Sequence, residues 1–191
     1  TADGGFDFSI DFNKQEELSY RIIICEIVSA LNILKDNGSF VCKIFDIHTN
    51  ITVKIIYLLT YYFEKVYITK PCTSRPANSE KYLVCINFKG IDDNVLDLLF
   101  LYIKKWDSLK DNILSFIDVP DIFFRKLFIY NNYISLLQIK NIKHTLDLIE
   151  NDIHNKNEII KDQTKIAIEW CNHYNIRINY NSKFMNKNIN Y

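Results

Sequence analysis

The sequence has no excess of either charge. Its 191 residues include 23 lysines and arginines against 23 aspartates and glutamates, so the formal net charge is +0. A protein that holds nucleic acid through bulk electrostatics usually carries a basic excess. The charge balance argues against that class, and any site for a polyanion has to be local.

Closely spaced cysteines are also lacking. The five cysteines are an odd number, and none of them forms a C-x-x-C pair. Zinc sites usually draw on such pairs, so a metal site is the less favoured alternative and we predict none. The pattern instead predicts reduced, buried thiols in an intracellular, reducing compartment, either the cytoplasm or the nucleus.

Long hydrophobic runs are absent too. The longest, residues 51–63, is interrupted by Lys54 and is shorter than the roughly 20 residues that span a bilayer. We therefore expect a buried helix there and no membrane association. The chain starts with Thr1 and shows no signal peptide, so we expect it to be a fragment or a processed product.

Over the first ninety residues, hydrophobic spacing predicts alternating strands and helices. The expected elements are a strand end and glycine turn at 1–6, a helix at 15–35 stopped by 36–38, a strand at 39–46, a helix at about 50–63 capped by Thr49, a strand at 65–69, a loop at 71–78 and a strand at 80–88. The paired glycines of the first turn permit positive φ and close backbone approach. This order is typical of half of a doubly wound α/β sheet.

Two of these elements allow sharper expectations. The helix at 15–35 should bury one stripe of side chains, namely Leu18, Ile22, Cys25, Ser29 and Ile33. The strand at 39–46 is apolar on both faces, which favours a central parallel strand.

After Gly90 the pattern becomes helical. Apolar residues recur near a 3.6-residue period over 94–105, 120–129 and 135–149. These helices are expected to pack on the sheet. The asparagine-rich tail after Asn172 is expected to be frayed or disordered.

Three charged residues stand out within this framework. Lys43 interrupts an apolar strand, where it is either a strand-edge lysine that reaches water or a functional amine. Asp3, before two glycines at a strand end, is either an ordinary turn aspartate or a ligand-binding group at the carboxyl edge of the sheet. Glu80, which opens the last strand after a polar loop, would by itself be a surface carboxylate.

Three motifs place these residues in a family context. The sequence reads ADGGF at 2–6, FVCKIFD at 40–46 and KPCTSRPANSEKY at 70–82. In this order they resemble the ADGGF, FxCKxFD and KPxTSRPANSExY motifs of FtsJ-like RNA cap 2′-O-methyltransferases of cells and large DNA viruses. The segment SLLQIK at 135–140 is similar to part of that family's C-terminal helices, and the resemblance fades beyond about residue 149.

The resemblance implies a fold and a domain division. Residues 1–90 would be the C-terminal half of a Rossmann-like methyltransferase sheet, and residues 91–191 a helical extension packed on it. The family's Lys-Asp-Lys-Glu tetrad carries over to Asp3, Lys43 and Glu80. Its first lysine, and the glycine loop that holds S-adenosyl-L-methionine, would lie upstream of Thr1, leaving Asp3 as the cofactor contact. The fragment alone should therefore bind the cofactor poorly.

The chemistry explains why the family needs such residues. A ribose 2′-hydroxyl must lose its proton as it attacks the sulfonium methyl group, and a neutral lysine can accept that proton. Free lysine has a pKa of about 10.4, so the site has to favour the neutral amine through desolvation, a second lysine and the positive sulfonium. We predict Lys43 as the general base, with Asp3 and Glu80 orienting it, and we expect all three side chains to converge at the rim of the sheet.

The resemblance further implies RNA contacts. These are expected from Asn13, Lys14, Gln15 and Asn78, while Ser74 and Arg75 could hold a phosphate. The alternative for Arg75 is a structural pairing that shapes its loop. Recognition of the 2′-hydroxyl favours RNA over DNA.

The predicted activity is thus methylation of the first transcribed nucleotide of capped mRNA. Ribosomal RNA is an alternative substrate, and a non-catalytic RNA-binding or assembly subunit is the alternative from a different class. The expected partners are capped RNA, the N-terminal remainder of the same protein, and other capping or transcription machinery. A viral protein would act in the host cytoplasm or the virion.

Overall fold

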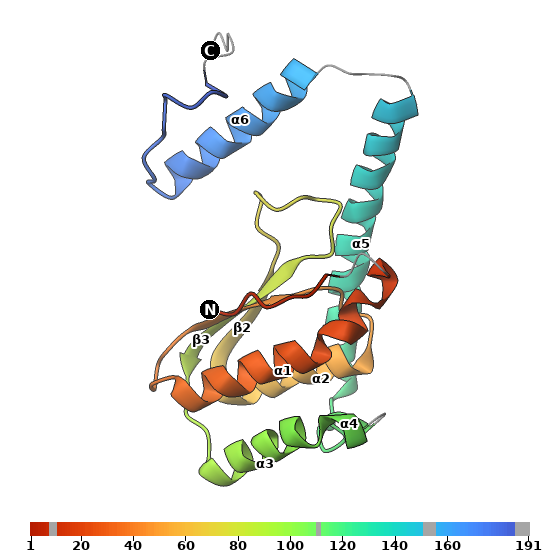
Figure 1. The fold of residues 1–191 in the computed structure, drawn as a ribbon, viewed down its shortest axis with the longest axis vertical. Coiled ribbons are helices and arrows are strands. Elements are labelled where there is room, and N and C mark those ends of the chain that lie inside the picture. Colours follow the sequence, from red (N-terminus) through yellow and green to blue (C-terminus); the bar gives the residue numbers. More distant parts are fainter. Residues whose placement is uncertain (8–10, 110–111, 151–155, 186–191) are drawn as a thin grey trace. The chain divides into compact units, whose positions relative to one another are not determined.

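The computed structural model describes residues 1–7, 11–109, 112–150 and 156–185, and within them three strands form one antiparallel sheet (Figure 1). Strand β1 spans Phe40–Ile44, β2 spans Phe63–Thr69 and β3 spans Lys81–Phe88, in the spatial order β1-β3-β2. Strand β3 runs antiparallel to both neighbours, and Ala2 forms an isolated parallel bridge with Cys42 of β1. The predicted α/β class is confirmed.

Our expectation of a central parallel strand at 39–46 is wrong, because β1 lies at the end of the strand order and its neighbour β3 runs antiparallel to it. The connection from β2 to β3, residues 70–80, contains no helix. Parallel neighbours need a crossover of a dozen or more residues, usually a helix, so this short loop favours antiparallel pairing. Strand β3 therefore inserts between β1 and β2, which are themselves joined through helix α2, Asn50–Tyr62.

Helix α1, Gln15–Ile33, and helix α2 pack against each other and against the sheet (Figure 1). Alternate strand residues point to one face, and there Cys42, Ile44 and Leu83 are fully buried. The opposite face carries only partly buried residues on β1, such as Val41. That opposite face is where β1 and β3 can present polar side chains.

The predicted helix boundaries agree with local features of the chain. A 3-10 helix, Phe12–Lys14, leads into α1, which ends before Asn37 adopts a positive φ of 63°. Thr49 caps α2 as predicted, because its side chain accepts a hydrogen bond from the Thr52 N–H.

The predicted buried stripe of α1 is wrong. Leu18 and Ile33 are 54% and 76% exposed, whereas Tyr20, Ile27 and Leu31 are buried. Helix α1 is apolar on more than one side, so its spacing alone does not reveal which side the sheet and α2 cover. Tertiary packing selects the stripe that runs through Ile27.

The C-terminal half of the chain is helical. Its elements are α3, Asp93–Lys104; α4, Trp106–Leu109; α5, Asp121–Glu150; and α6, Lys156–His173. We expected two helices over 120–129 and 135–149, but α5 is continuous for 30 residues. The intervening residues 130–134 contain neither glycine nor proline, so nothing interrupts the helix. Helix α6 was not predicted at all.

Two compact units divide these elements. The first contains Thr1–Pro71 and Asn78–Leu136, and the second contains Cys72–Ala77 and Leu137–Tyr191. Residues 91–136 thus pack with the sheet, and the family-based division at residue 90 stays a prediction. Residues 174–185 form turns and irregular structure, while the expected disorder at 186–191 lies outside the described residues. No helix in the described part of the chain has the length and apolar character to cross a membrane.

The thiols lead to a first prediction. All five cysteines are free; Cys42 and Cys85 are buried and Cys72 is exposed. Burial raises the pKa of Cys85 to about 12 and also raises that of Cys42, so neither forms the reactive thiolate near pH 8. We expect iodoacetamide at pH 8 to label Cys72 in the folded protein and to spare Cys42 and Cys85, as read by peptide mass spectrometry. Labelling in denaturant is the control, and labelling of native Cys85 as fast as Cys72 would contradict the prediction.

Candidate active site

Lys43 and Asp3 meet at the edge of the sheet. The parallel bridge between Ala2 and Cys42 places Asp3 beside Lys43, and the Lys43 Nζ lies 2.6 Å from the Asp3 Oδ1. The same amine donates to the Asp3 carbonyl at 3.2 Å. The Lys43 side chain is 15% exposed and that of Asp3 is 71% exposed. The amine is therefore shielded and fixed by its partner, while the carboxylate still faces solvent.

Glu80 reaches the same face through β3. Lys43 pairs with Tyr82 in the sheet register, so their side chains lie on one face. Glu80 precedes Tyr82 by two residues, and the Tyr82 hydroxyl donates to the Glu80 Oε1 at 3.3 Å. Strand alternation thus brings Glu80 toward the face that carries Lys43.

Tyr82 lies between Glu80, which its hydroxyl contacts, and Lys43, its partner in the register. The pKa of its phenol is raised above the usual value, first by burial and then by the negative charges of Glu80 and Asp3. Both carboxylates therefore act on one phenol, which itself lies opposite Lys43. The structure thus pairs Lys43 with Asp3 and Tyr82 with Glu80 on neighbouring strands, and the convergence of all three charged side chains stays a prediction.

Close packing shapes the glycine turn next to Asp3. The Gly4 N–H donates to the Glu26 Oε1 at 2.6 Å, and a Cβ at Gly4 would lie 2.5 Å from that oxygen. This explains the need for a residue without a side chain. Neither Gly4 nor Gly5 has a positive φ, so close approach, and not a left-handed backbone, is the reason for glycine here.

The predicted RNA contacts divide between the two compact units. In the first unit, Asn13 and Lys14 are exposed, and the Gln15 Oε1 accepts a hydrogen bond from the Ser79 hydroxyl at 2.8 Å. Asn78 is half-buried, and its side-chain oxygen accepts a hydrogen bond from Lys70 at 2.7 Å. Gln15 is thereby tied to the segment that carries Glu80.

Ser74 and Arg75 belong to the second unit, within Cys72–Ala77. Ser74 is half-buried and Arg75 is exposed. Their role in phosphate binding stays a prediction that rests on the motif.

Several residues of the site were missed by the sequence interpretation. Tyr82 lies inside the quoted motif, and the two-residue period of a strand already places it on the face of Glu80. Glu26 interrupts the apolar stripe of α1 four residues after Ile22, which is a usable signal. Lys70 and Lys81 gave no such signal, because the carbonyl groups that they contact cannot be seen in a sequence.

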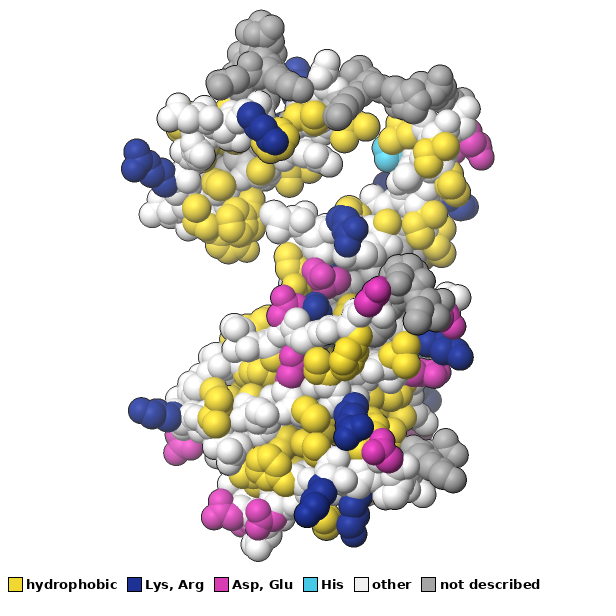
Figure 2. All heavy atoms as spheres, in the orientation of Figure 1, with side chains coloured by type: hydrophobic (Ala, Val, Ile, Leu, Met, Phe, Trp, Pro, Cys, Tyr) yellow, Lys and Arg dark blue, Asp and Glu magenta, His cyan; other side chains and the backbone are white. Residues whose placement is uncertain are grey.

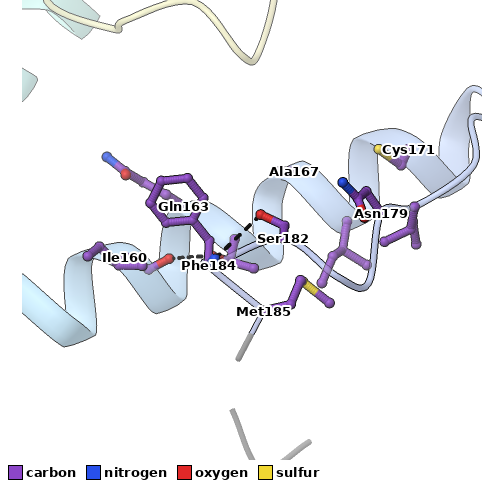
Figure 3. Close-up of a pocket in the computed structure, with 11 residues that line it drawn as sticks. Ile160, Gln163, Ala167, Cys171, Asn179, Ser182, Phe184 and Met185 are labelled. Carbon is purple, nitrogen blue, oxygen red and sulfur yellow. Dashed lines mark hydrogen bonds between the residues drawn. The ribbon is translucent and has the colours of Figure 1, made fainter. Parts of the chain in front are cut away.

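Other locations offer less chemistry. In the second unit, α6 and the following turns enclose a groove of about 330 Å³ (Figure 3). Its described lining residues, from Ile160 to Met185, are mostly apolar and include no carboxylate, amine or imidazole. Within the described residues, no group of three or more His, Cys, Asp or Glu side chains could hold a metal ion.

The surface charges match the balanced composition. Figure 2 shows lysines and arginines scattered among acidic side chains on the face in view, with no large basic patch among the residues described there. Recognition of an RNA on this face would thus depend on specific groups more than on a general field.

Comparison with known proteins supports the motif interpretation. Residues 1–88 match the model of the family described as FtsJ-like methyltransferase. The cap-specific mRNA (nucleoside-2′-O-)-methyltransferase 1 of Homo sapiens is 47% identical over 111 residues, which is 58% of this chain and 13% of that protein.

Similar proteins occur in other animals. The relative of the same name from Danio rerio is 41% identical over 118 residues, 62% of this chain and 14% of that protein. The one from Drosophila melanogaster is 51% identical over 84 residues, 44% of this chain and 11% of that protein. The chain thus spans only about an eighth of the length of these relatives.

Proposed function

We propose that the protein carrying this chain methylates the ribose 2′-hydroxyl of the first transcribed nucleotide of capped mRNA, because residues 1–88 match the model of the FtsJ-like methyltransferase family. The observation that carries the proposal is the shielded Lys43 amine, fixed by Asp3 on the face shared with Glu80 and Tyr82. The names of the similar proteins support mRNA caps over ribosomal RNA as the substrate. A non-catalytic scaffold has no need of this arrangement.

Lys43 acts as the general base in this proposal. The 2′-hydroxyl transfers its proton to the neutral Nζ as the ribose oxygen forms its bond to the methyl carbon. The 2.6 Å ion pair with Asp3 orients the amine. We therefore assign Asp3 to orientation and not to proton transfer.

Glu80 and Tyr82 line the same face. The Tyr82 hydroxyl donates to the Glu80 Oε1 at 3.3 Å, and we assign the Glu80 carboxylate to accept a hydrogen bond from a ribose hydroxyl. Gln15, Asn13, Lys14 and Asn78 would contact the RNA, with Ser74 and Arg75 as phosphate ligands.

S-adenosyl-L-methionine, when bound, supplies an activated methyl group. In this chain, Asp3 would face the cofactor. The Asp3 side chain is 71% exposed, and its negative carboxylate suits a cationic ligand. That fit is partial, as expected for a chain that spans 13% of a relative such as the human protein. The N-terminal remainder of the protein would supply the other cofactor contacts.

The five free thiols support a reducing location in cytoplasm or nucleus.

One assay tests the proposed function. The full-length protein, labelled S-adenosylmethionine and capped RNA should yield label at the first nucleotide. The same RNA, already 2′-O-methylated at that position, should accept none. Equal labelling of both RNAs would place the methyl group elsewhere, and labelling of ribosomal RNA alone would favour the alternative substrate.

A further inference from the structure

The three residues that lead into β3 are held by two lysines. The Lys70 Nζ donates to the Asn78 carbonyl at 2.9 Å and to the Glu80 carbonyl at 3.0 Å. The Lys81 Nζ donates to the Ser79 carbonyl at 2.8 Å. Residues 78–80 precede β3, which begins at Lys81. Their three carbonyls therefore accept hydrogen bonds from lysine ammonium groups, where carbonyls within a strand would accept from main-chain N–H groups of a neighbouring strand.

Lys81 also connects this segment to the end of β1. Its Nζ donates to the Phe45 carbonyl and to the Asp46 Oδ1, each at 3.2 Å. The three N–H bonds of the ammonium thus meet three acceptors. Lys81 is 1% exposed; burial lowers its pKa, and the negative charge of Asp46 opposes that shift. Complete hydrogen bonding is what makes a buried ammonium tolerable.

Lys81 cannot itself touch a substrate on the face of Lys43. In the register, Lys81 pairs with Ile44 and Tyr82 pairs with Lys43. Successive strand residues point to opposite faces, so Lys81 lies on the buried face with Ile44. Any effect of Lys81 on the reaction must therefore pass through the main chain of β1 and of residues 78–80.

We propose that Lys70 and Lys81 are positioning residues that fix the Glu80 carboxylate relative to Lys43. The inference rests on the proposed function, because only that function gives Asp3, Glu80 and Lys43 a role in the same methyl transfer. Lys81 ties the strand of Lys43 to the carbonyl before Glu80, and Lys70 holds the carbonyls of Asn78 and Glu80. Together they fix the backbone from which the Glu80 side chain extends.

The test compares kcat and KM in the full-length protein. Lys81→Met and Lys70→Met keep side-chain length but remove the donors. We expect each to lower kcat about 10- to 100-fold, because displacing a catalytic group by about 1 Å costs on that order. For Lys81→Met, whose amine bonds none of the residues expected to contact RNA, the KM for capped RNA should change less than about threefold. Lys70→Arg keeps donors at this half-buried position and should recover most of kcat.

A matched control separates positioning from general stability. Lys54 is a half-buried lysine of α2 whose Nζ donates to the Leu114 carbonyl at 3.1 Å. Like Lys70 and Lys81 it binds a main-chain carbonyl, but not one of residues 78–80. Lys54→Met should keep kcat near the wild-type value at a similar thermal unfolding temperature. Folded Lys81→Met or Lys70→Met with unchanged kcat, or with only a raised KM, would overturn the inference.

Two further outcomes are decisive. If Lys81→Met does not fold, Lys70→Met and Lys70→Arg decide the question, and equal kcat for those two variants overturns the inference. If the wild-type protein transfers no methyl group to capped RNA, the proposed function fails and the inference fails with it. An active wild type with active variants overturns the inference alone.

Discussion

Replacing Lys43 by alanine is expected to lower methyl transfer by the full-length protein about 1,000-fold, within the range that a lost general base costs. The mutation removes the only amine that the sheet register places opposite Tyr82 in the described residues. It also frees Asp3 from its 2.6 Å ion pair, but that carboxylate is 71% exposed and can be hydrated. Folding should therefore survive the loss. Initial rates with capped RNA, together with circular dichroism, measure both effects.

Lys65→Ala is the matched control for this experiment. Lys65 pairs with Ile86, four residues from Tyr82 along β3, so it shares the face of Lys43 but is exposed on β2. Its replacement should leave the rate within about twofold, because exposed lysines rarely contribute much on their own. Turnover of Lys43→Ala near the wild-type rate would remove Lys43 from the role of base.

The elements with strong local signals were predictable from the sequence. Thr49 was recognised as a cap because a threonine before an apolar helical run can accept a main-chain hydrogen bond. The 36–38 stop was predicted because asparagine and glycine tolerate positive φ, and Asn37 adopts it. The direction of β3 and the buried side of α1 depend on which elements pack together, and no local signal encodes that.

The site shows the same division. The motifs singled out Asp3, Lys43 and Glu80; the structure pairs Lys43 with Asp3, places Lys43 opposite Tyr82 in the register, and joins the Tyr82 hydroxyl to Glu80. The supporting contacts were not predictable, because they join side chains to main-chain groups far away in the sequence. Glu26 reaches Gly4 across 22 positions, and Lys81 reaches Phe45 across 36.

Glu16 is the largest of these hidden contacts, and replacing it by alanine is expected to destabilise the first compact unit by about 3 kcal/mol or more. Its side chain is 8% exposed. It accepts hydrogen bonds from the main-chain N–H groups of His48 and Thr49 and from the hydroxyls of Thr49 and Thr52, at 2.6 to 3.1 Å. Alanine would leave these donors without their acceptor at the start of α2. Thermal unfolding monitored by circular dichroism measures this loss of stability as a lower unfolding temperature.

Glu17→Ala is the control, because Glu17 is the exposed neighbour of Glu16 in the same helical turn. It should change the unfolding temperature little, and an equal loss for both variants would show that helix propensity, not the buried contacts, is responsible. Glu16→Gln should fall between them, because an amide retains one acceptor oxygen but loses the charge that strengthens each hydrogen bond. Glu16 directly follows Gln15, so the carboxylate that anchors the start of α2 is next to one of the residues expected to contact RNA.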